Sequence, residues 1–130
     1  MIRSTIFSLI LVFSCDLLGP PEINFISDSD LIEMQEIEYI LLDVRTPDEF
    51  SSGFIKKAKN VDFYSETFQN DLLSIDKSLA VVLYCRTNNR STKTANILKQ
   101  SGFKEISVLE GGITEWVKRG NDINYTTYSE

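Results

Sequence analysis

The residues best suited to chemistry in this sequence form one run, which consists of Cys85, Arg86, Thr87, Asn88, Asn89, Arg90 and Ser91. A Cys thiolate is a strong nucleophile, and the two arginines supply positive charge for an anionic reactant. The chain contains no His. A Cys-His or Ser-His base pair and an imidazole zinc site are therefore excluded, and we expect neither a metal nor a cofactor. Groups other than His must stabilise the thiolate of Cys85.

The elements around this run would place it at a binding edge. Residues 79–84 are strongly apolar and predict a buried strand that delivers Cys85 at its carboxyl end. Residues 91–100 predict a helix that ends at Gly102. A short loop before a helix N-terminus points several backbone N–H groups at one spot. Such groups stabilise a thiolate, a bound anion or the outer sulfur of a persulfide. We therefore predict an anion-binding loop over residues 86–91.

The remaining sequence alternates between strand and helix patterns. We expect strands at residues 23–26, 39–44, 58–63, 79–84 and 106–109. We expect helices after Ser27 or Asp28, after Thr46, and over residues 66–75, 91–100 and 113–119, with a sharp turn at Gly111-Gly112. Strands and helices that alternate with short connections predict an α/β fold, in which a parallel sheet carries helices on both faces.

Several side chains before the Cys85 run are candidates for supporting it. Asp43 and Arg45 could form a fixed ion pair that supports the loop or could contact the substrate directly, and we favour support. Thr46 can cap the next helix, and Glu49 is placed to complete a capping box. Glu49 could also hold an arginine.

Composition sets the broad class of protein. A chain of 130 residues, 42% of them hydrophobic, is expected to form a single domain with a real core. Its net charge of −6 argues against nucleic acid as a partner. We interpret Lys56, Lys57 and Lys59 as a solvated basic run, with contact to an anionic lipid or donor as the alternative. Trp116 is expected to pack in the core.

The N-terminal segment has the layout of an export signal. Arg3 precedes an apolar stretch, residues 6–13, that is too short to span a bilayer as a helix. Val12-Phe13-Ser14-Cys15 resembles a bacterial lipobox, although Phe13 is larger than the usual residue. We expect a signal peptide over residues 1–14, a lipid on Cys15, and a tether over residues 15–22 that holds the domain on the periplasmic side of a bacterial membrane. An ordinary cleaved signal, an uncleaved anchor and a misread first strand are the alternatives.

Three motifs in order resemble those of the rhodanese family. The first runs from Leu42-Asp43-Val44-Arg45 to Asn60, the second is the loop from Tyr84 to Ser91, and the third is Leu109-Glu110-Gly111-Gly112-Ile113 with Trp116. The resemblance implies a five-stranded parallel sheet over residues 23–120, with residues 121–130 as a tail. It also implies a sulfurtransferase in which Cys85 takes sulfane sulfur from a thiosulfate-like donor. The resulting persulfide would pass this sulfur to cyanide or a thiol acceptor.

The loop length and two departures refine this resemblance. Four residues separate Cys85 from Arg90, as in the sulfur-transferring members, whereas related phosphatases and arsenate reductases carry one residue more. Phe54 stands where the family usually has His, so we expect altered packing rather than lost chemistry. Asn88 replaces the usual Gly, and because Asn tolerates a left-handed backbone, we expect the loop to close.

Two other functions compete with sulfur transfer. One is a non-catalytic module that keeps the rhodanese fold for partner binding, which retention of Cys85 and Arg90 argues against. The other is a thiol redox enzyme, such as an arsenate reductase, which the loop length argues against. The physiological sulfur donor and acceptor stay open.

Overall fold

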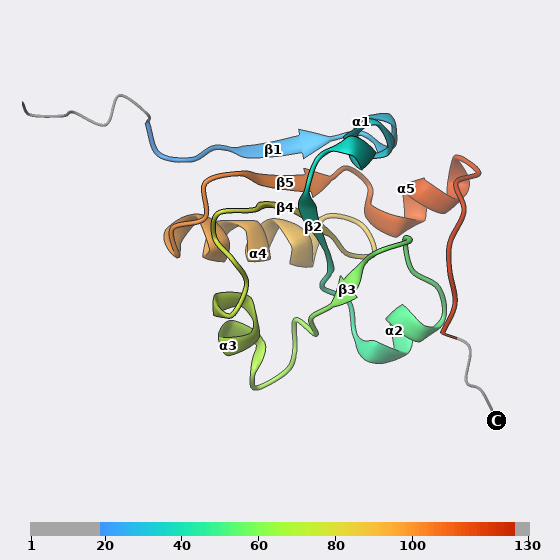
Figure 1. Cartoon of the computed structure of the whole chain (residues 1–130). Helices are drawn as coiled ribbons and strands as arrows, with labels where there is room; N and C mark the ends of the chain where they lie inside the picture. Colours follow the sequence, from blue (N-terminus) through green and yellow to red (C-terminus); the bar gives the residue numbers. More distant parts are fainter. Residues whose placement is uncertain (1–18, 127–130) are drawn as a thin grey trace, which may run out of the picture.

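A computed structural model describes residues 19–126 of the chain. Five strands form one sheet in the order β1-β5-β4-β2-β3, and all neighbouring strands are parallel (Figure 1). The strands are β1 (Ile23–Ile26), β2 (Tyr39–Asp43), β3 (Lys59–Asn60), β4 (Ala80–Tyr84) and β5 (Ile106–Leu109). The predicted α/β fold with a five-stranded parallel sheet is confirmed. The expected signal peptide at residues 1–14 and the expected lipid site at Cys15 lie outside the described residues.

Within residues 19–126, five α-helices and one short 3-10 helix accompany the strands, and the last helix follows the last strand. They are α1 (Asp28–Glu33), η1 (Met34–Glu36), α2 (Pro47–Ser51), α3 (Phe68–Leu73), α4 (Asn89–Gln100) and α5 (Gly112–Lys118). In the part of the chain that the structure describes, no helix is both long and apolar enough to cross a membrane.

The sheet has a separate apolar core on each face. One core packs α3 and α4 against the sheet and includes Leu83 of β4 and Leu98 of α4. The other packs α1 and α5 and includes Val82 of β4 and Trp116 of α5. Successive side chains of a strand point to opposite faces, so the apolar run of β4 contributes to both cores. The strand that ends at Cys85 is therefore held from both sides.

The capping patterns in the sequence form as predicted. Ser27 caps α1, and its hydroxyl accepts a hydrogen bond from the Asp30 N–H at 3.1 Å. Thr46 caps α2, and its hydroxyl accepts from the Glu49 N–H at 3.3 Å while the Glu49 carboxylate accepts from the Thr46 N–H at 2.9 Å. This reciprocal pair fixes where α2 begins, directly after the buried end of β2.

Three elements differ from their predictions by two or more residues. The strand expected at 58–63 is only Lys59–Asn60, because the Asn60 side-chain amide donates to the carbonyls of Asp43 and Arg45 as the chain leaves the sheet. The helix expected at 66–75 is Phe68–Leu73, since Ser65 and Thr67 make a local turn before it. The helix expected at 91–100 begins two residues earlier, at Asn89.

The chain after α5 packs back on the domain. The backbones of Phe54 and Asn124 exchange two hydrogen bonds of 2.9 and 2.8 Å. The Trp116 indole donates to the Asp122 carbonyl at 2.9 Å, and Ile123 packs against the α1 and α5 core. A Cβ on Gly53 would lie 2.6 Å from Ile123, so this glycine allows the close approach. The first residues of the expected tail are thus part of the folded unit.

Candidate functional site

Cys85 lies at the carboxyl end of β4 and is almost completely buried, with 1% exposure. Its side chain belongs to the core on the α3 and α4 face. The sulfur lies 3.4 Å from the Ser91 hydroxyl, which in turn donates to the Asn88 carbonyl at 3.2 Å. A hydroxyl has one proton to donate, so the neutral thiol can donate to Ser91. The thiolate could instead accept from Ser91 after the hydroxyl rotates.

The loop after Cys85 is docked through its carbonyl groups onto the start of α5. The Cys85 and Arg86 carbonyls accept from the N–H groups of Ile113 and Thr114 at 3.0 and 3.1 Å. Gly112 makes this contact possible, because a Cβ there would lie 2.4 to 2.8 Å from the carbonyl oxygens of residues 85, 86 and 87. The predicted sharp turn at Gly111-Gly112 is confirmed by positive φ angles of 72° and 56°.

This docking orients the N–H groups of the loop. In a trans peptide the N–H points opposite to the preceding carbonyl, and the described chain has no cis peptide bond. The N–H groups of Arg86, Thr87 and Asn88 therefore face away from α5. Within residues 19–126, none of the three donates a hydrogen bond, not even to the Cys85 sulfur. They are free to bind an anionic group on the side of the loop that faces away from α5.

Asn88 does not have the backbone that we expected. Its φ is −136°, so it is not left-handed, and the loop closes by another route. The Asn88 side-chain carbonyl accepts a hydrogen bond from the Gly111 N–H at 3.0 Å. The side chain thus ties the loop to the turn before α5 and does not cap α4.

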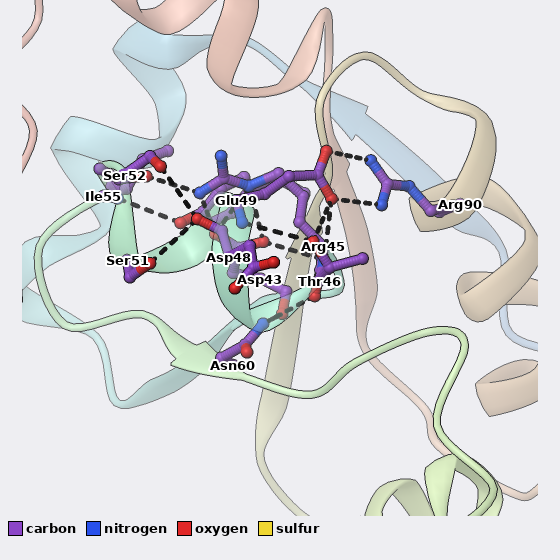
Figure 2. A network of polar contacts seen from close by, with 12 residues as sticks. Asp43, Arg45, Thr46, Asp48, Glu49, Ser51, Ser52, Ile55, Asn60 and Arg90 are labelled. Atoms are coloured by element: carbon purple, nitrogen blue, oxygen red, sulfur yellow. Dashed lines mark hydrogen bonds and ion pairs between the residues drawn. The ribbon is translucent and has the colours of Figure 1, made fainter.

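Arg90 is held by a carboxylate from another element. Its two terminal nitrogens contact the two oxygens of Glu49 at 2.7 and 2.9 Å (Figure 2). Its guanidinium also lies 5.8 Å from the Tyr64 ring centroid. The hydrogen bonds from Arg90, with those from Thr46, lower the pKa of Glu49 from 4.5 to about 2. The pKa of Arg90 is raised by the same pair. Glu49 thus caps α2 and also fixes the closing arginine of the loop.

Asp43 and Arg45 form a buried ion pair behind this network. The Arg45 side chain contacts both Asp43 oxygens, with a shortest distance of 2.6 Å, and also donates to the Gly53 carbonyl at 2.6 Å (Figure 2). The pair joins the end of β2 to the end of α2. Its contacts are with the backbone that supports the site, which is the geometry expected of a supporting role.

The other candidate residues of the loop lie at its surface. Arg86, Thr87 and Asn89 are exposed, and Arg86 has no ion-pair partner in the described part of the chain. Phe54, in the position where His was expected from the resemblance, stacks on Phe50 with ring centroids 4.2 Å apart. Among residues 19–126, no group of three or more Cys, Asp or Glu side chains is placed to hold a metal ion.

Sequence reasoning missed two contacts of this site. The bond from Gly111 to Asn88 joins residues 23 positions apart, and no local pattern indicates such a pairing. The contact between Cys85 and Ser91 could have been predicted from sequence, because Ser91 lies in the first turn of the helix that follows the end of β4.

Comparison with known proteins identifies the family. The model of the Rhodanese-like domain matches residues 27–119, so the chain belongs to the rhodanese-like domain family. The chain is 37% identical over 76 residues to the uncharacterized protein YqhL of Bacillus subtilis, a match that covers 58% of this chain and 59% of YqhL. It is 32% identical over 83 residues to a sulfurtransferase of Allochromatium vinosum, covering 64% of this chain and 76% of the relative.

A solved structure gives the same fold. The structure of a rhodanese-related protein from Thermoplasma volcanium matches with a TM-score of 0.70 and 27% sequence identity. The match covers 79% of this chain and 99% of that protein.

Proposed function

We propose that this protein is a sulfurtransferase that carries sulfane sulfur as a persulfide on Cys85. The Cys85 thiolate attacks the outer sulfur of a thiosulfate-like donor and forms an S–S bond with it. The S–S bond of the donor breaks, and its electron pair leaves with sulfite. A thiol acceptor or cyanide then takes the outer sulfur from the persulfide, and Cys85 returns to its thiolate form.

The observation that carries the proposal is the set of free N–H groups in the loop that follows Cys85. Those of Arg86, Thr87 and Asn88 face away from α5 and have no partner in the described chain. Backbone N–H groups that converge on one spot bind a negative charge, and in a persulfide the outer sulfur carries that charge. The loop can therefore stabilise the intermediate without a histidine.

The charges around the loop support an anionic donor. Arg86 is exposed and unpaired within residues 19–126, so it is available to attract thiosulfate. Arg90 is engaged with Glu49, so its role is to fix the end of the loop. The small loop, with four residues between Cys85 and Arg90, favours a single sulfur over a tetrahedral oxyanion.

The test is the intact mass of the purified protein before and after incubation with thiosulfate. A gain of one sulfur atom that cyanide removes, and that Cys85→Ser abolishes, is the expected result. Cys15→Ser is the matched control, because it removes the other cysteine of the chain and should leave the gain unchanged. If the folded protein gains no sulfur, thiosulfate is not its donor, and a binding module or a redox enzyme becomes the better interpretation.

We also propose that the protein is exported and anchored by a lipid on Cys15 at the periplasmic side of a bacterial membrane. The support is the order of Arg3, the apolar residues 6–13 and Ser14-Cys15. Expression in a bacterial host should place the protein in the membrane fraction, and Cys15→Ser should release it. Equal distribution of both forms in the soluble cytosolic fraction would contradict this proposal.

A further inference from the structure

A second candidate site lies away from the Cys85 loop. A cavity of about 230 Å³ opens beside the start of β2, where α1, α5 and the turn after α2 meet. Its apolar lining has one exposed side chain, Ile32 of α1, which is 42% exposed, and behind it lie the buried side chains of Leu31, Leu41, Ile55 and Trp116. No residue of the 85–91 loop lines it. The volume equals that of roughly eight liquid water molecules, at about 30 Å³ each, so an occupant would be small.

Two lysines stand at the mouth of this cavity. Lys56 and Lys57 line it, both are exposed, and neither contacts a carboxylate within residues 19–126. The whole chain has a net charge of −6, so this pair is a local exception on an acidic protein. Unpaired positive charge beside an apolar lining matches a ligand that has an apolar body and an anionic end.

The backbone at Lys57 is strained. Lys57 has a φ of +72° and is the only non-glycine residue with positive φ among the described residues. It is the third residue of a turn that the Ala58 N–H closes onto the Ile55 carbonyl at 3.0 Å. Glycine is the usual residue at such a position, because a Cβ is disfavoured there. The turn therefore places the Lys57 side chain at the mouth at a cost in backbone strain, as functional sites often do.

Tyr39 gives the cavity a polar group on its inner wall. Its side chain lines the cavity, and its hydroxyl makes no hydrogen bond within the described part of the chain. Burial raises the pKa of Tyr39, so the hydroxyl keeps its proton at neutral pH. A protonated, unpartnered hydroxyl can donate to an anionic oxygen at the mouth.

We propose that this cavity binds a medium-chain carboxylate. The alkyl chain lies along Ile32 and over the edge of Trp116, and the carboxylate lies between Lys56 and Lys57. This site is separate from sulfur transfer, so its occupancy does not depend on the chemistry of Cys85.

The fluorescence of Trp116 tests the proposal directly, because it is the only tryptophan in the chain. The full-length protein is titrated with octanoate below its micelle concentration, and a saturable change in emission is expected. Octanol, which has the same chain without the charge, should bind about tenfold more weakly, the effect of roughly 1.4 kcal/mol.

Matched variants separate the ligand from the fold. Lys57→Gly removes the charge and relieves the backbone strain, so it should weaken octanoate binding while it raises the melting temperature. Lys59→Ala removes a charge from the same basic run but from a residue that does not line this cavity, so binding should persist.

Any of four results would overturn the proposal, and three of them come from the titrations. They are a response to octanoate that does not saturate, equal binding of octanol and octanoate, and octanoate binding that Lys57→Gly leaves unchanged. Binding to phosphatidylglycerol vesicles without binding of free octanoate would also overturn it, in favour of a membrane-surface contact.

Discussion

Cys85 has a polar neighbour in Ser91 and an otherwise apolar surrounding. A buried thiol in an apolar core is normally inert. The Ser91 hydroxyl at 3.4 Å is the one side-chain hydrogen-bond partner of the sulfur among the described residues. We infer that Ser91 supplies a hydrogen bond to the thiolate, both when it attacks the donor and when it leaves the persulfide.

Substitution of Ser91 should therefore slow the chemistry more than it harms the fold. Ser91→Ala is expected to reduce the rate of persulfide formation about tenfold, the effect of one hydrogen bond to a charged sulfur. The rate is measured by intact mass after rapid quenching. Thr94→Val is the control, because this buried hydroxyl of the same helix bonds to the Arg90 carbonyl instead of the sulfur. A rate for Ser91→Ala equal to that of the wild type would exclude this role.

Glu49 connects two elements through one carboxylate. It completes the capping box of α2 and holds Arg90 of α4. Its folded-state pKa of about 2 lies below its ordinary value of 4.5, so folding favours the ionised form. The resulting stabilisation is fully present above pH 4.5 and is lost as the pH falls toward 2.

The pH dependence of stability should show this contribution. At pH 7, Glu49→Gln is expected to lower the free energy of unfolding by about 1 to 2 kcal/mol, a value reduced by the partial exposure of the pair. The difference from the wild type should shrink as the pH is lowered from 4.5 toward 2 in urea titrations. Glu105→Gln, which removes an exposed carboxylate without an ion pair in the described chain, should show no such trend. A difference that is constant with pH would contradict the assignment.

The contact between α5 and the Cys85 loop depends on Gly112. An added Cβ would lie within 2.8 Å of three backbone carbonyl oxygens, which cannot move without opening the loop. Gly112→Ala is therefore expected to cost more than about 3 kcal/mol of unfolding free energy and to abolish persulfide formation. Gly120→Ala is the matched control, because Gly120 also has positive φ but has open space around it.

The two glycine variants are compared by urea unfolding. Gly120→Ala should lower the free energy of unfolding by only about 1 to 2 kcal/mol, which is the cost of placing an L-residue at positive φ. If both variants lose the same amount, the close contact of Gly112 with the loop does not matter for stability.

Local sequence patterns predicted which strands and helices form more accurately than they predicted where each one begins and ends. The apolar runs at 39–44 and 79–84 indicated buried strands, and Thr46 and Glu49 indicated the start of α2, because these signals depend on neighbouring residues. The strand at 58–63 was predicted too long, because the Asn60 amide bonds to β2 and its neighbouring loop. The left-handed backbone predicted for Asn88 was also wrong, because the side chain of Asn88 is held by the N–H of Gly111, which comes from a distant segment. Contacts between distant segments determine both features.

At the scale of the whole molecule, the C-terminal segment closes the domain. Residues 121–124 connect α5 to the loop after α2, through Trp116 on one side and Phe54 on the other. The resemblance to the family indicated an end near residue 120, because its motifs stop at the last helix. Beyond that point the hydrogen bonds are made by backbone groups of Asp122 and Asn124, which sequence does not specify, and Ile123 adds an apolar contact.

Removal of residues 121–130 should therefore destabilise the protein. It deletes two backbone hydrogen bonds to Phe54, the bond from Trp116 and the apolar contact of Ile123. The expected loss is about 2 to 4 kcal/mol of unfolding free energy, measured by urea unfolding. An unchanged unfolding midpoint would mean that these contacts contribute nothing to the folded state.

The position of β1 in the sheet affects the order in which the domain can form. The strand that begins at Ile23 pairs only with the strand that begins at Ile106. A chain that emerges from a ribosome or a membrane pore with its N-terminus first exposes β1 long before β5 is present. The sheet is therefore completed late, by contacts between the two ends of the domain, and such distant pairing slows folding. The first strand to be made is thus among the last parts of the sheet to reach its final place.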